Sequence, residues 1–421
     1  MRYDFTSSVD REGTGAFKTD RNMVKVYLGL NYYDDTISMW VADMDFACSP
    51  HIVERLKERC DKLIFGYSGA TPQYYSSIMR WYRDRYGVML DPSWIVNSNG
   101  TVLAIRNSIK AFTEKGDKII IQSPVYYPFS SEIKETGREV LDNQLLKDEN
   151  NNYTIDFADF EEKCKEAKMF IYCNPHNPIG KVWSKEVTQR LIDIANKYGV
   201  IVFSDEVHSD LTRKDVSFIS AIGLDNTDNV VVATAVNKTF NLAGLSATNL
   251  IIRNPELRQR LSAFTGMVML SPFAMEATIA AYKDSAEWVD ELREVLDENL
   301  CYMYEFIKDK LPKVKFNIPE GTYLAWLDLS EYGVSEQELL HAFANDAHIV
   351  LEGGSMFGKM GEGFIRMNVA CPKDVLVDAM DRTYKLLHDY KPNKFAGISF
   401  AAPSAGGCGC SCGPSDNTKC C

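Results

Sequence analysis

The sequence predicts an α/β protein with a large domain, built on a mainly parallel sheet flanked by helices, and a smaller α+β domain. Three observations predict this fold. The chain has 421 residues, more than one hydrophobic core normally supports. Short apolar runs alternate with amphipathic helical patterns through its middle. A long amphipathic helix then leads into alternating, strand-like segments.

The elements of the large domain can be predicted in order. A helix is expected to begin at Ser49 and Pro50, because proline suits the first helical turn. A second helix is expected over residues 184–198, with Ser184 as its N-cap and Gly199 as its terminator. Continuous apolar runs typical of strands buried on both faces lie at residues 118–122, 169–173, 200–204, 230–234 and 249–252. Alternation of strands and helices indicates a parallel sheet.

The smaller domain is expected to begin with a long helix. An amphipathic pattern runs over residues 285–311 and ends at Pro312, and strand-like alternation follows around residues 323–327. The predicted division is an N-terminal segment packed on the small domain, the large domain, the small domain and a tail, at residues 1–48, 49–285, 286–392 and 393–421.

The tail differs from the rest of the chain in composition. Five of the eleven cysteines lie between Cys408 and Cys421, in a Gly/Ser-rich stretch. We expect this tail to be disordered. A soft-metal or sulfur-carrier role is the alternative, although Cys-X-Cys-X-Cys without a second half-site is no zinc-finger pattern. The other six cysteines lack the spacing of a disulfide framework.

Charge and hydropathy narrow the functional classes. The chain carries 58 acidic and 46 basic residues, a formal charge of −12, which would repel nucleic acids and anionic membranes. The N-terminus lacks the apolar core of a signal peptide, and no segment offers eighteen uninterrupted apolar residues. We therefore expect a cytoplasmic protein that acts on a small molecule and binds neither nucleic acid nor membrane.

Five motifs are expected where an α/β sheet presents its ligands, at the carboxyl ends of strands, and three of them offer loops for a ligand. The first, at residues 98–102, could hold a phosphate on backbone N–H groups, although an ordinary capped loop would look the same. The second, at residues 123–129, could lay an aromatic ring on a flat heterocycle, or be only a packed aromatic turn. In the third, at residues 174–180, prolines fix a loop from which Asn177 could donate to a ligand oxygen.

Two further motifs carry charge. Asp205, in the segment Asp-Glu-Val-His, ends a strand where a buried acid needs a cationic partner, and a protonated pyridine nitrogen is such a partner. Lys238 follows the next strand in a mostly uncharged setting, where a desolvated amine is a better nucleophile. Taken alone, such a lysine would usually lie at the surface.

Together these motifs resemble the aspartate-aminotransferase (type I) fold of pyridoxal-phosphate enzymes, and more narrowly the MalY/PatB group of cystathionine β-lyases, or C–S lyases. The similarity spans roughly residues 1–390. Four more blocks are similar to that group: Met-Trp-Val-Ala-Asp-Met-Asp-Phe at 39–46, Phe-Gly-Tyr at 65–67, Glu-Gly-Thr-Tyr-Leu-Ala-Trp at 320–326 and Phe-Ile-Arg-Met-Asn-Val-Ala-Cys-Pro at 364–372.

The resemblance implies a role for each matched residue. Lys238 would carry pyridoxal 5'-phosphate as a Schiff base, Asp205 would pair with its pyridine nitrogen, and Tyr126 would stack on its ring. Asn177, with His208 nearby, would bond the phenolic oxygen. The other implied cofactor and substrate contacts are Gly100, Thr101 and Val102 at the phosphate, Asn237 beside the lysine, Tyr67 reaching the phosphate of the neighbouring subunit, Arg366 at the substrate α-carboxylate and the backbone near Ala42 assisting it. A homodimer with shared active sites is thereby implied, and no metal.

Three positions depart from the family pattern. The group usually has Ser before the lysine and Pro before the phosphate-loop glycine, where this chain has Asn237 and Asn99. Many aminotransferases of this fold also carry a phosphate-binding Arg eight residues after the lysine, where this chain has Ser246. Phosphate neutralisation would therefore rest on fewer charges.

The resemblance implies β-elimination on cystathionine or S-substituted L-cysteines, which gives a thiol, pyruvate and ammonia. Lys238, Asp205 and Tyr67 would be its catalytic residues. The alternative is a class I/II aminotransferase that moves an amino group between an amino acid and a 2-oxo acid, because Lys238 and Asp205 serve both reactions. A protein that only binds the cofactor is a third hypothesis, and the retention of Lys238, Asp205 and Arg366 favours catalysis over it.

Overall fold

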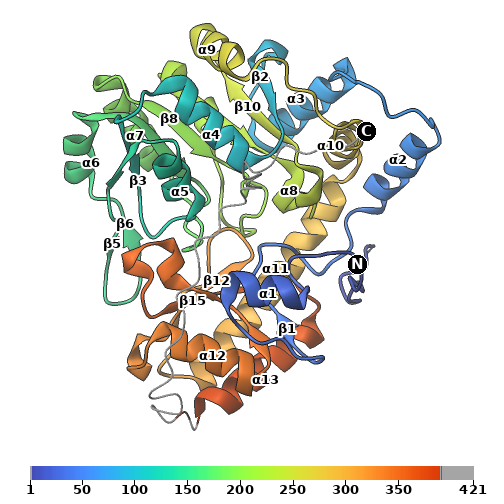
Figure 1. The fold of residues 1–421 in the computed structure, drawn as a ribbon, viewed down its shortest axis with the longest axis vertical. Helices are drawn as coiled ribbons and strands as arrows, with labels where there is room; N and C mark the ends of the chain where they lie inside the picture. Colours follow the sequence, from blue (N-terminus) through green and yellow to red (C-terminus); the bar gives the residue numbers. More distant parts are fainter. Residues whose placement is uncertain (1, 389, 391–421) are drawn as a thin grey trace, which may run out of the picture.

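The computed structural model describes residues 2–388 and 390, and the predicted cysteine-rich tail lies outside the described residues. Within this part, the middle of the chain builds a seven-stranded sheet in the order β2-β10-β9-β8-β7-β3-β4 (Figure 1). Its strands are, along the chain, β2 (Ile95–Ser98), β3 (Lys118–Ile121), β4 (Glu139–Asp142), β7 (Ala167–Cys173), β8 (Ile201–Asp205), β9 (Val230–Thr234) and β10 (Thr248–Ile252). The five predicted strand runs are confirmed, and β2 and β4 were not predicted.

The sheet is mainly parallel, as predicted. Strands β4, β3, β7, β8 and β9 run parallel to one another, whereas β10 is antiparallel to both β9 and β2. The four inner strands β7, β8, β9 and β10 are almost wholly buried, which explains their continuous apolar sequences.

Helices cover both faces of this sheet. One face packs against α4 (Thr101–Phe112), α5 (Pro128–Glu135) and α9 (Pro255–Thr265). The other packs against α3 (Pro72–Tyr86), α6 (Phe157–Cys164), α7 (Lys185–Lys197) and α10 (Pro272–Asp284). The predicted N-cap of α7 is confirmed, because the Ser184 hydroxyl accepts from the N–H of Val187. The helix predicted at Ser49 is α2 (Pro50–Cys60), which packs against α10.

A second core forms around the four-stranded antiparallel sheet β11-β12-β15-β14. Its strands are β11 (Lys315–Phe316), β12 (Leu324–Asp328), β14 (Glu352–Gly353) and β15 (Phe364–Asn368), and its helices are α12 (Glu336–Asp346) and α13 (Lys373–His388). The long helix α11 (Ala286–Lys310) joins the two cores: Trp288 and Leu292 lie in the first, and Met303 and Ile307 in the second. The predicted domain boundaries stay predictions.

The N-terminal segment lies against the second core (Figure 1). Its strand β1 (Ile37–Ser38) pairs in parallel with β13 (Ile349–Val350), and its helix α1 (Arg21–Leu28) contributes Val24 to a small cluster with Trp40 and Val350. This arrangement brings residues 39–46 to the junction of the two cores.

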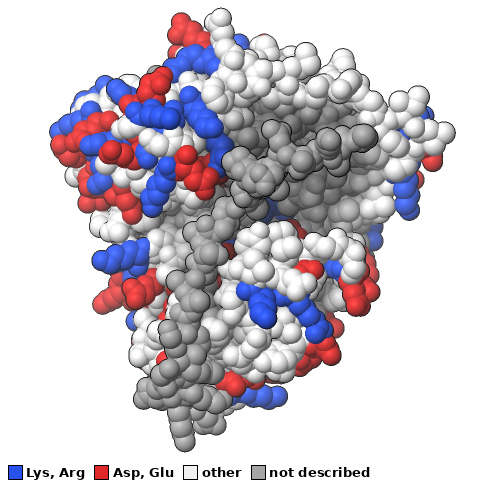
Figure 2. All heavy atoms as spheres, in the orientation of Figure 1, with Lys and Arg blue, Asp and Glu red and all other residues white. Residues whose placement is uncertain are grey.

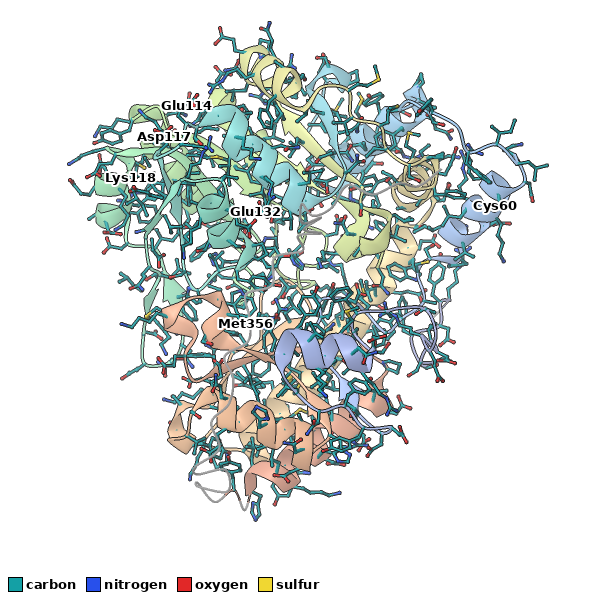
Figure 3. All side chains as sticks on the ribbon, viewed as in Figure 1. Cys60, Glu114, Asp117, Lys118, Glu132 and Met356 are labelled. Carbon is teal, nitrogen blue, oxygen red and sulfur yellow. The ribbon has the colours of Figure 1, made fainter. Side chains whose placement is uncertain are left out.

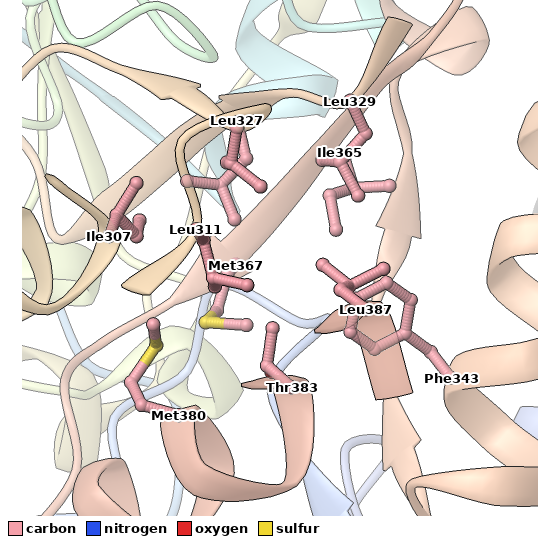
Figure 4. A pocket seen from close by; sticks show the side chains of 11 residues that line it. Ile307, Leu311, Leu327, Leu329, Phe343, Ile365, Met367, Met380, Thr383 and Leu387 are labelled. Atoms are coloured by element: carbon pink, nitrogen blue, oxygen red, sulfur yellow. The ribbon is translucent and has the colours of Figure 1, made fainter. Parts of the chain in front are cut away.

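A small apolar cavity lies inside the second core (Figure 4). It is lined by Ile307, Leu311, Val314, Leu327, Leu329, Phe343, Ile365, Met367, Met380, Thr383 and Leu387, of which only Thr383 has a polar side chain. None of these is a predicted site residue. Within the described residues, every helix is too short or too polar to cross a bilayer.

Candidate active site

The predicted motifs meet at one edge of the large sheet. Tyr126, Asn177 and Lys238 lie in the segments that follow β3, β7 and β9, and Asp205 is the last residue of β8. The carboxyl ends of these parallel strands share one edge. Strand β2 ends there too, and α4 begins immediately after it. The sheet topology therefore gathers residues that are far apart in the sequence.

The start of α4 presents backbone N–H groups to this edge. Gly100 has a φ of 104°, which favours glycine, and no side chain caps the helix that begins at Thr101. The hydroxyl of Thr101 lies 2.9 Å from that of Thr248, and a Cβ on Gly100 would lie 3.9 Å from Cβ of Ser246. An ion pair between Arg106 and Glu132 ties α4 to α5, and Figure 3 labels Glu132. Uncapped N–H groups and the helix dipole together favour a phosphate.

Asp205 is a buried carboxyl without a cationic partner. It is 5% exposed, and within the described residues its carboxyl group accepts one hydrogen bond, a 3.3 Å contact from the N–H of Val207. No lysine or arginine within residues 2–388 forms an ion pair with it. Burial raises its pKa to about 6, while the charge of Lys238 lowers it less. A protonated ring nitrogen would supply the missing positive charge.

Lys238 lies on the short helix α8 (Val236–Thr239), which follows β9. Its Nζ donates to the carbonyl oxygen of Ala42 at 3.0 Å, and the hydroxyl of Tyr323 donates to the same oxygen at 2.9 Å. Burial lowers the pKa of the Lys238 amine, and the nearby carboxylate of Asp43 partly opposes this. The amine is thus easier to deprotonate, which a nucleophile and base requires.

The segment that holds Lys238 is itself fixed from both cores. The side-chain amide of Asn241 bonds both the N–H and the carbonyl of Met44, and Asn368 donates to the carbonyls of Val41 and Asp43. Arg11 of the N-terminal segment forms an ion pair with Asp43 at 2.9 Å. The block at residues 39–46 therefore connects the large sheet, the small sheet and the N-terminal segment.

Arg366 lies on β15, opposite this block, and is 4% exposed. Its Nη1 donates to Oδ1 of Asn177 at 2.9 Å, and its Nη2 donates to the carbonyl of Trp40 at 3.2 Å and to the carboxylate of Glu352. Its Nε has no partner. Because Oδ1 of Asn177 accepts from Arg366, the amide nitrogen of Asn177 can donate to a ligand.

The remaining predicted residues lie around this group, with one exception. Tyr126 is half-buried, and its N–H donates to the carbonyl of Asn177 at 3.0 Å. Within the described part of the chain, Nδ1 of His208 and Oδ1 of Asn237 are buried without partners. Burial lowers the pKa of His208 well below its usual value, so its ring is neutral. Tyr67, the exception, is 97% exposed in the loop between α2 and α3.

Four residues that contact the site were not assigned a role from the sequence. Tyr323 and Asp43 lie within blocks that were noted for their similarity to the lyase group, so a signal for them existed. Arg11 and Glu352 lie in segments without a recognised motif. Both reach the site through contacts with residues more than ten positions away, which local patterns do not reveal.

The donor set suits pyridoxal phosphate. Uncapped N–H groups match its phosphate, Asp205 its pyridine nitrogen, the free amide of Asn177 its phenolic oxygen, and the amine of Lys238 its aldehyde. His208 and Asn237 belong to the motifs that carry Asp205 and Lys238. Their buried Nδ1 and Oδ1 atoms, which lack partners among the described residues, can form hydrogen bonds with a ligand.

Comparisons with known proteins agree with this geometry. The model of the family "Aminotransferase class I and II" matches residues 34–382. The chain is 38% identical to the cystathionine β-lyase PatB of Bacillus subtilis, over 90% of this chain and 98% of PatB, and 30% identical to the protein MalY of Escherichia coli, over 89% and 96%.

Among solved structures, cystalysin from Treponema denticola, which contains pyridoxal 5'-phosphate, superposes with a TM-score of 0.88 at 34% identity, over 93% of this chain and 100% of cystalysin. The similarity covers both cores and all the site motifs. The chain therefore belongs to the class I and II aminotransferase family, in the group that includes the PatB- and MalY-type cystathionine β-lyases.

Proposed function

We propose that this protein is a pyridoxal-phosphate-dependent carbon–sulfur lyase of the cytoplasm. It acts by β-elimination on cystathionine or an S-substituted L-cysteine and releases a thiol, pyruvate and ammonia. The observation that carries the proposal is the meeting of three groups at the junction of the two sheets: the amine of Lys238 and the buried carboxyl of Asp205 from the large sheet, and the guanidinium of Arg366 from β15 of the small sheet. The cofactor, when bound, withdraws electrons from the substrate Cα.

Lys238 has two tasks in this proposal. Its amine holds the cofactor aldehyde in the absence of substrate and, once displaced, takes the proton from Cα. Burial favours the neutral amine, which is the form that can accept this proton. The hydrogen bond to Ala42 fixes the direction of the Nζ atom. The carboxylate of Asp205 keeps the ring nitrogen protonated, because in a buried setting the negative charge of the carboxylate stabilises the positive charge of the protonated nitrogen.

Arg366 orients the substrate. Its guanidinium binds the α-carboxylate, while the carbonyl of Trp40 and the amide oxygen of Asn177 hold it in place. The ring of Phe357 lies 4.7 Å from the guanidinium carbon and restricts it further. With the carboxylate fixed, the Cα–H bond can be presented to Lys238.

The leaving group decides the outcome at Cβ. The Cβ–S bond breaks as Lys238 removes the Cα proton, and a thiol with a pKa near ~8.5 leaves as thiolate without strong acid assistance. The thiolate is protonated by solvent, and the released 2-aminoacrylate hydrolyses to pyruvate and ammonia. Aminotransfer instead requires Lys238 to return its proton to the cofactor, so a good leaving group favours elimination.

We also propose that the protein is a homodimer with shared active sites. Exposed apolar side chains gather beside Tyr67: Leu63 is 81% exposed, Ile64 76% and Met267 85%. Phe65 packs on Phe273 at the start of α10, so the loop after α2 lies next to the connection between α9 and α10. The upper right of the face in Figure 2, which carries these elements, is largely uncharged. Cys60 at the end of α2 (Figure 3) is also exposed. A second copy would cover such a surface.

One experiment separates the lyase from the aminotransferase. The purified holoenzyme is incubated with cystathionine and no 2-oxo acid, and free thiol, pyruvate and ammonia are followed over many turnovers. Equimolar thiol and pyruvate are expected. If products appear only when a 2-oxo acid is supplied, the aminotransferase hypothesis replaces the lyase.

A further inference from the structure

A buried carboxylate lies directly on the proposed substrate-binding arginine. Glu352 of β14 stands opposite Arg366 of β15 in the sheet register, and the two side chains form an ion pair. Both side chains are 4% exposed. Among the described residues, the Glu352 carboxylate accepts a hydrogen bond from Arg366 alone. The resting site therefore contains a carboxylate already bound to the group that must receive the substrate carboxylate.

Charge balance makes this arrangement consequential. One guanidinium can compensate one carboxylate in a buried setting, and two carboxylates that share one site cannot both stay ionised without a large cost. Docking of an α-carboxylate on Arg366 would place a second negative charge beside Glu352. A proton from solvent on one of the two removes the conflict, and Glu352, whose side chain is 4% exposed, is the one shielded from bulk solvent.

The other groups around Glu352 do not replace this compensation. Lys238 is the second nearby cation, and its amine must be neutral to act as a base. The Tyr126 hydroxyl is neutral, because burial raises its pKa. The His208 ring is also neutral, because burial and the nearby charge of Arg366 lower its pKa. From α12, the carboxyl of Glu336 packs at Gly353 and accepts from the N–H and hydroxyl of Ser355. Asp205, the other buried acid near Lys238, is assigned to the cofactor ring.

We propose that Glu352 is a charge-balancing, positioning residue of the substrate site, which holds Arg366 before substrate arrives and takes up one proton from solvent when a carboxylate docks there. The inference rests on the proposed role of Arg366. Burial already raises the pKa of Glu352, with Arg366 and Lys238 opposing it, and a docked carboxylate raises it further. Because the bound state holds one more proton, substrate binding weakens as pH rises.

The test uses a carboxylate that cannot react with the cofactor. The probe is 3-(methylthio)propanoate, which has the carboxylate and thioether of a substrate but no amine. Its Kd for the holoenzyme is measured from pH 5.5 to 9. We expect the wild-type Kd to rise with pH by up to about tenfold per unit, the limit for one linked proton. Glu352→Gln should bind the probe more tightly than wild type at pH 8 and lose the slope.

Glu336→Gln is the matched control, because Glu336 packs on the same strand but does not touch Arg366, and it should keep the wild-type slope. Calorimetry of the wild type in buffers of different ionisation heat, over the same pH range, gives the proton uptake directly and decides the question even if Glu352→Gln fails to fold. A flat wild-type Kd, a slope that survives in Glu352→Gln, or no proton uptake at any of these pH values overturns the proposal.

Failure of the inference and failure of the proposed function are distinguishable. Arg366→Ala should lose most probe affinity while it retains its cofactor absorbance. If the probe binds equally well to Arg366→Ala, Arg366 is not the carboxylate site, and both the inference and that part of the function fall. If the probe depends on Arg366 but its binding is independent of pH, only the role of Glu352 falls.

Discussion

Lys238 and Asp205 show how burial prepares two residues for opposite tasks. Burial disfavours charge on both, so it lowers the pKa of the amine and raises that of the carboxyl. The sequence predicted these two residues because each follows a buried strand. It could not reveal Glu352, whose partner Arg366 is adjacent only through the antiparallel pairing of β14 and β15.

Replacement of Lys238 tests the assignment of the base. Lys238→Ala removes both the covalent anchor and the proton acceptor, and loss of a general base alone typically costs 10²–10⁴ in rate. We expect pyruvate formation from cystathionine to fall at least that far, and bound cofactor to lack the absorbance of a Schiff base with the protein. Lys214→Ala, at a lysine whose side chain is 80% exposed, is the control and should leave the rate unchanged. Turnover within tenfold of wild type in Lys238→Ala would refute the role.

The second prediction at this scale concerns Asp205 and pH. Its pKa in the cofactor-free fold, about 6, lies above the usual 3.8, so the folded state binds more protons than the unfolded state between these values. Stability is therefore lost as pH rises from about 4 to about 6 and stays lower above that, by on the order of 3 kcal/mol. Cofactor-free Asp205→Asn should unfold at an equal or higher temperature than wild type at pH 8, and this advantage should vanish below pH 4.

Binding of the cofactor should reverse this order of thermal stability between wild type and Asp205→Asn. When the ring nitrogen compensates Asp205, wild type should gain more thermal stability from the cofactor than Asp205→Asn does. Glu206 gives the matched control: it is a buried carboxyl with a pKa raised to about 7 by burial, but it accepts from Ser204 and Ala221 rather than facing Lys238. Glu206→Gln should gain as much from the cofactor as wild type. Equal gains for wild type and Asp205→Asn would contradict the pairing.

At the scale of elements, the sequence predicted the strands that are buried on both faces, because such strands give continuous apolar runs. It missed the strands that are not. Strand β2 contains Asn97 and Ser98, and the edge strand β4 has no fully buried residue, so neither gives an apolar run. The antiparallel direction of β10 was also not predicted. Strand direction depends on the path of the connection between β9 and β10, which an apolar run does not reveal. The position of four of the five site motifs was predictable, since each follows or ends a strand that was recognised, whereas the motif at residues 98–102 follows β2, which was not.

The N-terminal segment offers a prediction at the same scale. Lys18 is 1% exposed, and its Nζ donates to Asp45 at 2.7 Å and to the carbonyl of Asp43 at 3.0 Å. Lys18→Met leaves these acceptors without a donor, although Asp45 remains partly hydrated, so we expect a loss of roughly 2–3 kcal/mol in unfolding free energy. Arg21→Ala removes an exposed ion pair with Asp34 in the same segment, which solvent screens, and should leave the unfolding free energy almost unchanged. Denaturant unfolding measures both, and equal losses would contradict a structural role for Lys18.

At the scale of the whole molecule, residues of two site motifs are exposed. Tyr67 is almost fully exposed, and Val102 and Leu103 in the first turn of α4 are 36% and 42% exposed. The sequence alone indicated this only through the resemblance, because an interface between identical chains leaves no periodic pattern of its own. The exposed apolar surface around residues 63–67 supports a second copy as the missing wall.

Complementation between two inactive variants tests the shared site. Tyr67→Ala should lower activity because the cofactor phosphate loses a hydrogen bond from the neighbouring subunit, and Lys238→Ala should abolish it. In a mixed dimer, one site combines Lys238 of the first variant with Tyr67 of the second and is intact, whereas the other site carries both substitutions. Random pairing of equal amounts makes about half of all dimers mixed, so about a quarter of the sites should be native. Co-refolded variants should therefore regain about a quarter of wild-type pyruvate formation above the background of the two variants measured alone. If Tyr67 serves its own subunit, every site in the mixture carries a lesion and no activity returns; a monomer in sedimentation at micromolar concentration would likewise refute the shared site.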